Sequence, residues 1–467
     1  MGQTLLFPVR ILWKIFSRVA GALMLLFSFL VWCLRLMRHY QVLRRAEIVV
    51  LMIRPSGFGH SIQGPDATRR LYPGRNCVFI APYWNFAHDP EFNPLAAQLW
   101  SDIEVLFLPR FAWAVQRNHR VISLPFQRWH DWAITWATKL LTRLVCTRGV
   151  KFTGLMEVYI EALEAALGEP AGKELSLLQG SSKEGRKAWE SYAHEIGYML
   201  LLKKTGEENP GDFPRIHLPE IIRSDIESRS IEAWQTAGEK GDPKRCCLYL
   251  RAEGRQSYTT QLRNTSSVEA HLGAVRLLNK AGYQVFLTGD REMTEETRRE
   301  FQGRLMDAES LRLERNLYPL FAATEADIFI GNCGGGLAPA LVNAIPCLFI
   351  DWFPYYIGYP NAWFYFKPVV TEAGEPVAAV DLIARHVYDL GCSFGRLENN
   401  SPPEIEAAVA VFLDDLDHPD RPDPYADIVE LFPSDTPFRL SGARVSPAWA
   451  RQYFKDPVSR PDIKSAI

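Results

Sequence analysis

The sequence predicts an α/β protein in which two Rossmann-like domains face a cleft, preceded by a membrane-associated helix. Short apolar runs broken by glycines recur along the chain and are typical of parallel strands covered on both faces. They form two series on either side of a glycine- and charge-rich joint, Gly238–Arg245. At 467 residues the chain is too long for one ordinary core. The expected segments are a helix in 1–45, an N-terminal domain in 46–240, a C-terminal domain in 241–415 and a tail in 416–467.

The composition argues against several classes of protein. Hydrophobic residues make up 47% of the chain and charged residues 23%, as in a globular protein. A net charge of -2 gives no reason to expect nucleic acid as a partner. The eight cysteines form no CxxC pair, which fits reduced thiols in the cytoplasm better than disulfides or a zinc site. No HExxH motif occurs and no convincing DxD motif follows a strand, so neither a metal nor a cofactor is expected.

The most apolar region, Leu5–Tyr40, predicts a helix that contacts a membrane surface through residues 5–40. Its uncharged core, Val19–Leu34, would be about 24 Å long as a helix, short of the roughly 30 Å hydrocarbon layer. A helix in the interface is therefore favoured over a single span, and the lack of a small-residue cleavage site argues against a signal peptide. Five flanking cations fall within an arc of roughly 160° at helical spacing: Arg10, Lys14, Arg18, Arg35 and Arg38.

The stretch Ala326–Ile350 carries the strongest signal for a ligand. A helix N-terminus has free backbone N–H groups, and adjacent glycines let a phosphate approach them closely. The turn Asn332–Gly336 is therefore interpreted as a cradle for the phosphates of a nucleotide-sugar donor. A tight βα turn without a ligand is the alternative. In order, the stretch predicts a strand, a glycine turn, a helix and a second strand: Ile328–Ile330, Gly331 with Gly334–Gly336, Leu337–Asn343 and Cys347–Ile350.

Arg251 ends an earlier predicted strand, Cys246–Leu250. Arginine suits a diphosphate because its planar fork donates two hydrogen bonds and stays charged. Arg251 and the Gly334–Gly336 corner are expected over one crevice, where they would stabilise a leaving nucleoside diphosphate. A surface ion pair is the alternative for Arg251 and for Arg255.

Between these two motifs the sequence predicts a further helix and strand. The helix Val268–Lys280 can be capped by Ser266 or Ser267. The strand Tyr283–Thr288 is followed by Gly289 and Asp290. Asp290 is expected either to hold a ribose hydroxyl or simply to form a turn.

The N-terminal domain opens with a strand, Ile48–Ile53, followed by a turn with Gly57 and Gly59 and a helix start at His60. The G-x-G spacing does not continue to GxGxxG, which argues against NAD or FAD. His60 is expected to accept a proton from a sugar hydroxyl or to bind a phosphate, and a structural turn cap is the alternative. Further strands are predicted at Asn76–Pro82 and Glu104–Leu108.

The rest of the chain predicts helices and one aromatic surface. Trp113–Trp136 is rich in aromatic and basic residues, which could stack on sugars, contact a membrane or form ordinary core. Helices are expected at Glu157–Leu167, at Lys183–Gln235 with a break at Asn209–Pro214, and at Pro402–Leu413.

Taken together, these motifs resemble bacterial GT-B glycosyltransferases found with surface-polysaccharide genes, which are distant relatives of fucosyltransferases. The resemblance covers about Ile48 to Leu413. It rests on Gly57-Phe58-Gly59-His60 with Asn85, Leu250-Arg251 through Tyr258 to Arg263-Asn264, Gly282-Tyr283 to Gly289-Asp290, Ala326-Asp327 to Gly334-Gly335, and Leu397 through Ser401 to Ile405 and Val409. The family commonly has serine in the loop where this chain has Cys333-Gly334-Gly335, so a hydroxyl is lost and backbone donors are kept.

The resemblance implies roles for both halves of the chain. In GT-B enzymes the C-terminal half holds the donor and the N-terminal half the acceptor, and the terminal segment often crosses back to the first domain, as Trp449–Phe454 could do. The donor contacts implied are Arg251, Arg263, Asn264, Gly289, Asp290, Asn332, Gly334, Gly335 and Gly336, and the acceptor or cleft residues are Gly57, Gly59, His60 and Asn85.

The expected function is a membrane-associated, metal-independent and inverting glycosyltransferase at the cytoplasmic face of the inner membrane. It would move a sugar from a nucleotide-diphosphate donor to a lipid-linked or polysaccharide acceptor, with Arg251 and His60 as catalytic residues. Two alternatives are a non-catalytic membrane-bound scaffold on the same fold and a sugar-nucleotide epimerase.

Overall fold

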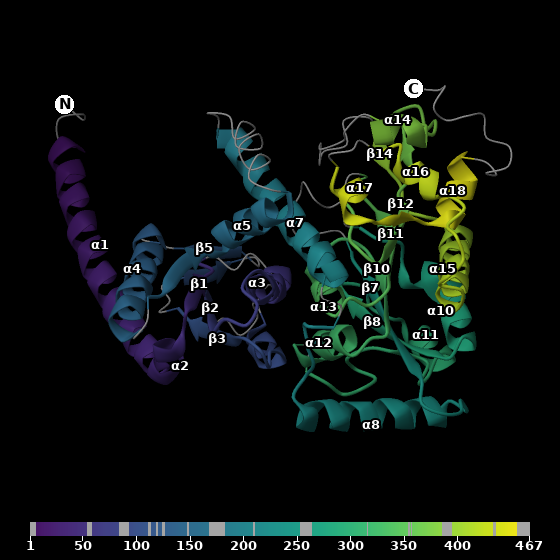
Figure 1. Cartoon of the computed structure of the whole chain (residues 1–467), viewed down its shortest axis with the longest axis horizontal. Coiled ribbons are helices and arrows are strands. Elements are labelled where there is room, and N and C mark those ends of the chain that lie inside the picture. Colours follow the sequence, from purple (N-terminus) through teal and green to yellow (C-terminus); the bar gives the residue numbers. More distant parts are fainter. Residues whose placement is uncertain are drawn as a thin grey trace. The chain divides into compact units, whose positions relative to one another are not determined.

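The computed structural model consists of two compact units, Met1–Glu161 and Ala162–Ile467 (Figure 1). Each contains a parallel β-sheet with helices, so the predicted α/β class is confirmed. The structure describes residues 6–53, 58–83, 93–110, 114–117, 120–123, 127–146, 149–167, 183–208, 211–252, 264–314, 316–353, 355, 357–384, 395–432 and 436–454.

The first unit is built on a four-stranded sheet in the order β3-β2-β1-β6. All neighbouring strands are parallel: β1 (Ile48–Leu51), β2 (Cys77–Tyr83), β3 (Glu104–Pro109) and β6 (Lys151–Gly154). The first three were predicted within two residues because they are short apolar runs. A small antiparallel hairpin, β4 (Ala114–Arg117) with β5 (Arg120–Ser123), follows β3.

Helices cover both faces of this sheet. Val78 and Ile80 of β2 pack in one cluster with Trp32, Leu36 and Ile134. Phe79 points to the opposite face and packs against Gly64 of α3 (Phe58–Leu71). A Cβ atom at Gly64 would lie 2.6 Å from the Phe79 ring. The first face is thus covered by α1 (Leu6–Met37), α2 (Tyr40–Arg45) and α4 (Gln127–Val145), and the second by α3, with α5 (Leu155–Leu167) following β6 and η1 (Pro94–Leu99) preceding β3.

The predicted N-terminal helix is a single α-helix, α1. Among the helices that the structure describes, none combines the length and apolar character needed to cross a membrane. Contact of α1 with a membrane surface stays a prediction.

The second unit is built on a seven-stranded sheet in the order β15-β12-β11-β10-β7-β8-β9, with every neighbouring pair parallel. Its central strands were predicted closely because each is an apolar run that ends at a glycine or a charged residue. The strands are β7 (Lys244–Leu250), β8 (Tyr283–Gly289), β9 (Leu305–Met306), β10 (Ile328–Gly331), β11 (Cys347–Trp352), β12 (Ala362–Phe366) and β15 (Arg444–Val445).

Helices also cover both faces of this larger sheet, α10, α15 and α18 on one and α12 with α13 on the other (Figure 1). Ser267 caps α10 by accepting a hydrogen bond from Ala270 N at 3.3 Å, as predicted. The helices are α7 (Lys183–Glu208), α8 (Glu220–Thr236), α10 (Val268–Lys280), α11 (Glu295–Glu300), α12 (Leu317–Thr324), η2 (Gly335–Leu337), α13 (Ala338–Val342), α14 (Ala379–Ala384), α15 (Pro402–Asp417), α16 (Ala426–Val429), α17 (Pro437–Ser441) and α18 (Pro447–Phe454), and β13 (Val369–Val370) pairs with β14 (Arg396–Leu397).

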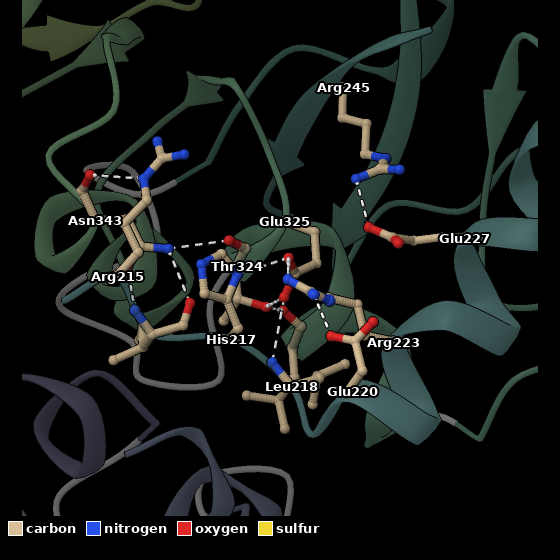
Figure 2. Close-up of polar contacts among 12 residues, drawn as sticks. Arg215, His217, Leu218, Glu220, Arg223, Glu227, Arg245, Thr324, Glu325 and Asn343 are labelled. Atoms are coloured by element: carbon tan, nitrogen blue, oxygen red, sulfur yellow. Dashed lines mark hydrogen bonds and ion pairs between the residues drawn. The ribbon is translucent and has the colours of Figure 1, made fainter. Parts of the chain in front are cut away.

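The boundary between the units falls earlier than the expected position near residue 240. The segment before α8 is bonded to the second unit (Figure 2): Asn343 accepts from Ile216 N at 2.8 Å and donates to Ile216 O at 3.1 Å. Glu325 contacts His217 Nδ1 at 2.8 Å and accepts from Leu218 N at 3.2 Å. Because these contacts are between residues far apart in sequence, local composition did not reveal them.

The expected hinge at Gly238–Arg245 likewise lies inside the second unit. Arg304 donates to Glu239 at 2.8 Å and to Ala237 O at 3.1 Å, and Arg245 pairs with Glu227 of α8 at 2.8 Å. These bonds fasten the joint to the sheet and to α8, so a hinge here is not supported.

The described part of the tail packs within the second unit. β15 pairs with β12, and α18 packs on α15 and β12. Trp449 of α18 is buried with its ring centroid 5.1 Å from that of Phe366. The expectation that Trp449–Phe454 crosses back is therefore corrected: the aromatic residues of this helix complete the core around β12.

Candidate functional site

The strand order of the second sheet reverses between β7 and β10. From β7 the chain proceeds outward through β8 to β9, whereas β10 begins the series that proceeds through β11 to β12 on the other side. In open α/β sheets, ligands bind beyond the carboxyl ends of the strands at such a reversal. The structure therefore marks the ends of β7 and β10 as the place to look for a site.

Arg251 and the glycine corner meet at this place. Arg251 directly follows β7, and Gly334 follows β10 by three residues. A Cβ atom at Gly334 would lie 2.9 Å from Nη1 of Arg251. The two motifs thus lie together as expected, and binding of a ligand by them stays a prediction.

Tyr249 also contributes to the corner and was not singled out from the sequence. Tyr249 is in β7, and Arg251 directly follows this strand. Because the two residues are two positions apart in extended chain, both side chains point to the same face of the sheet. Cβ atoms at Gly334 and Gly336 would lie 2.6 Å from its hydroxyl oxygen and 2.5 Å from its ring. Only glycine fits against Tyr249 at positions 334 and 336, which explains these two glycines without any ligand, and the Tyr249 side chain packs directly on the corner.

The helix after the corner is shorter than predicted. In place of one helix over Leu337–Asn343, the chain forms the single 3₁₀ turn η2 and then α13, which has five residues. A helix of this length has a small dipole, so the dipole contributes less to anion binding than expected. The attraction for an anion would come from Arg251 and from the backbone N–H groups of the half-buried Gly334 and Gly335, because the N–H of Cys333 donates to Asn332 Oδ1 at 2.5 Å.

Arg251 is held in place from two sides. Its backbone N–H donates to Thr265 Oγ1 at 2.9 Å, and its Nε contacts Asp290 Oδ2 at 3.3 Å. Burial lowers the pKa of Arg251, but Tyr249 and the Asp290 carboxylate outweigh it and raise the pKa above the ordinary value. The guanidinium is therefore charged. The ion pair considered as an alternative is formed through Nε, while Nη1 lies at the glycine corner.

The backbone of Gly289 and Asp290 packs against Leu250, the residue before Arg251. Gly289 has φ +103°, and a Cβ there would lie 2.0 Å from Leu250 O, so glycine is required for this close approach. Asp290 N donates to Leu250 O at 2.9 Å. The structure thus gives Asp290 a role in orienting Arg251, and contact with a ribose stays a prediction.

Asp351 lies at the centre of a buried network under the corner. Its Oδ2 accepts from Ser266 N at 2.8 Å and its Oδ1 from Asn400 N at 2.5 Å. Asn332 Nδ2 donates to Asp351 O at 2.7 Å. The Asn332 side chain is fully buried in this network, so it ties β10 to β11 and is not placed as the donor contact expected from the sequence.

Lys367 fixes Asn264, which begins the range 264–314 of the described residues. It is 1% exposed, and its Nζ donates to Asn264 O and to Asn399 Oδ1, both at 2.5 Å. Asn264 Oδ1 accepts from Arg291 Nη2 at 2.8 Å. Lys367 was missed in the sequence. A lysine within the apolar run Ala362–Val370 is itself a signal for a polar site, because a charge is buried only where polar groups bind it.

Burial lowers the pKa of Lys367 to about 8, and Asp351 opposes this shift only in part. Since the ordinary value is 10.5, the unfolded chain binds more protons than the folded chain between these two pH values. Lys367 should therefore add to the free energy of unfolding as pH rises in this window, by on the order of 1 kcal/mol between about pH 7.5 and about pH 9. In urea unfolding at both pH values, the change in the free energy of unfolding should be more positive by this amount in the wild type and in Lys280→Met, an exposed control, than in Lys367→Met. An equal change in all three chains would contradict this assignment.

The remaining predicted residues are placed as follows. His60 lies in the first turn of α3, half-buried, and Gly59 beside it is buried. His60 follows β1, which with β6 marks the reversal of strand order in the first sheet. Gly57, Asn85, Arg255 and Arg263 lie outside the described residues. Within the described ranges, no three His, Cys, Asp or Glu side chains are grouped so that they could hold a metal.

The sequence matches no protein-family model and no curated protein. Among solved structures, it is similar to the glycosyl transferase family 9 protein from Veillonella parvula, with 11% identity, a TM-score of 0.42, and coverage of 79% of this chain and 97% of that one. It is also similar to the E. coli heptosyltransferase with ADP-2-deoxy-2-fluoro heptose, with 12% identity, a TM-score of 0.32, and coverage of 70% and 94%. A UDP-glucosyltransferase from Polygonum tinctorium has 12% identity, a TM-score of 0.29, and coverage of 78% and 94%.

Proposed function

We propose that the chain is a metal-independent GT-B glycosyltransferase whose second unit binds a nucleotide-diphosphate sugar. One observation carries the proposal: a charged guanidinium and a glycine corner meet where the strand order of the sheet reverses. Fixed N–H donors of this kind suit a diphosphate, whose negative charge grows as it leaves the sugar.

In the proposed reaction an acceptor hydroxyl attacks the anomeric carbon from the side opposite the diphosphate, which inverts the configuration. The bond from that carbon to the phosphate oxygen breaks, and its electron pair stays on the diphosphate. Arg251 and the N–H groups of Gly334 and Gly335 stabilise that charge, which would otherwise require a metal. His60 is proposed as the base that takes the proton of the hydroxyl.

The acceptor is proposed to be a lipid-linked or polysaccharide chain held by the first unit. Residues 5–40 would contact the cytoplasmic face of the inner membrane, which gives access to a lipid-linked acceptor. The support is the long helix α1 with its apolar sequence and basic flanks.

A binding experiment tests this function. GDP, UDP and ADP are added separately. The nucleotide that the chain binds should, at about 100 times its dissociation constant, raise the free energy of unfolding by about 2.7 kcal/mol. The corresponding nucleosides serve as controls because they lack the diphosphate. If none of the nucleoside diphosphates stabilises the chain, the scaffold alternative is favoured. Release of free nucleoside diphosphate together with sugar transfer would distinguish a transferase from an epimerase.

A further inference from the structure

The exposed hydrophobic side chains of the protein are concentrated on one part of the first unit. In the described part of the chain, every exposed large hydrophobic residue except Ile221 and Val380 lies on α1, α2 or α4. Scattered single residues of this kind are normal on a soluble surface, whereas a contiguous set marks an interaction site. Prominent members are Leu23, Leu30 and Leu34 on α1 and Trp132, Trp136 and Leu144 on α4.

Polar bonds hold α1 and α4 together as neighbours. Ser28 Oγ lies 2.6 Å from His130 Nδ1, and Trp32 Nε1 donates to Thr138 Oγ1 at 2.8 Å. Burial and the nearby Arg110 lower the pKa of His130, although Asp131 raises it, so the imidazole stays neutral. We call this line of contact between α1 and α4 the seam. The seam fixes the two helices as one layer over the sheet (Figure 1).

The apolar rows of the two helices point away from this seam. Ser28, Trp32 and Leu36 are buried at four-residue spacing, and Leu30 and Leu34 lie roughly 180° around the helix from them. On α4, Trp132 and Trp136 are each 57% exposed and also four residues apart, with ring centroids 5.7 Å from one another. The outer side of the layer is therefore apolar along both helices.

The charges on this layer are almost all positive. Residues 1–46 contain no aspartate or glutamate. The one acidic residue of α4, Asp131, is buried and pairs with Arg110 at 2.5 Å. Exposed cations lie on α4, on α2 and directly after α1, and no ion pair joins them to another described residue: Arg38, Arg44, Arg45, Lys139 and Arg143. An apolar face with cations and no exposed carboxylate complements an anionic lipid surface.

We propose that α1 and α4 together form a docking face for an anionic lipid bilayer, with Trp132 and Trp136 at the level of the headgroups. Tryptophan prefers this level because its ring is apolar and its N–H is polar. The proposal deepens the membrane contact of the proposed function, which involved residues 5–40 alone, by adding a second helix. It explains why two tryptophans are exposed side by side, and it does not depend on the nucleotide site.

Binding of the purified full chain to lipid vesicles tests this face. Vesicles of phosphatidylcholine with one quarter phosphatidylglycerol are compared with vesicles of phosphatidylcholine alone by sedimentation. The wild type should bind the anionic vesicles at least about tenfold more tightly, and added salt should weaken this binding. Trp132→Gln/Trp136→Gln and Lys139→Gln/Arg143→Gln should each weaken it about tenfold. Ile221→Gln and Val380→Gln, which remove exposed apolar side chains elsewhere, should bind as the wild type does.

Unchanged vesicle binding by the tryptophan and cation variants, folded by circular dichroism, would overturn the proposal. It would also be overturned if the wild type ignored vesicles and formed a dimer that the tryptophan variant could not form, since the face would then bind a second copy. The assay contains no nucleotide, so its failure is distinct from failure of the nucleotide-binding test.

Discussion

Replacing Arg251 with alanine should lower kcat/KM for sugar transfer by about 100- to 1,000-fold. The effect is large because the guanidinium is charged, oriented by Asp290 and Thr265, and placed with Nη1 against Gly334. Alanine would leave the backbone N–H groups of the corner as the main source of positive charge for the leaving diphosphate. The loss should appear mainly in kcat, because the charge it stabilises is greatest in the transition state.

Two further variants make this test specific. Arg251→Lys keeps the charge and loses the planar fork, so it should recover only part of the activity. Arg276→Ala removes an exposed arginine of α10 that pairs with Glu300, and it should leave activity unchanged. If a folded Arg251→Ala protein transferred sugar at the wild-type rate, Arg251 would have no part in the mechanism.

Replacing Asp351 with alanine should lower the free energy of unfolding by about 3 kcal/mol or more. The carboxylate is fully buried and accepts from the backbone N–H groups of Ser266 and Asn400. Both donors would lose their partner, and the buried Lys367 would lose a compensating charge. The backbone of Asp351 also has φ +56°, which aspartate tolerates better than alanine.

Urea unfolding of matched variants measures this effect. Asp414→Ala removes an aspartate that is half exposed and pairs with Arg421 on the surface, so it should change stability little. Asp351→Asn keeps one acceptor oxygen and should lie between the two. Equal stability of Asp351→Ala and Asp414→Ala would show that the network does not support the corner.

The sequence allowed the strands and the meeting of Arg251 with Gly334 to be predicted for one reason. Both depend on local pattern: an apolar run of four to seven residues that ends at a glycine or a charge predicts where a parallel strand begins and ends. The order of such units along the chain then brings the ends of β7 and β10 to the same edge of a sheet.

The features that were missed depend on distant partners. Asp351 binds residues that are 85 and 49 positions away, and Lys367 binds Asn264 at a distance of 103 positions. The contacts of Asn343 and Glu325 that place residues 215–219 in the second unit span more than 100 positions. No local pattern encodes such pairs. The helix predicted over Leu337–Asn343 agrees with α13 to within one residue at each end, and the 3₁₀ turn η2 before it was not predicted.

The way α1 is built into the first unit has a consequence for how the protein could leave a bilayer. Trp32 and Leu36 of α1 fill the same core as Val49, Ile80 and Ile134, while its other side is apolar and exposed. Helix α1 is therefore part of the folded unit, and its removal would expose the core of the sheet to solvent. Release from lipid would have to move the whole unit intact, so any reversible attachment would be governed by headgroup charge and salt rather than by proteolytic trimming.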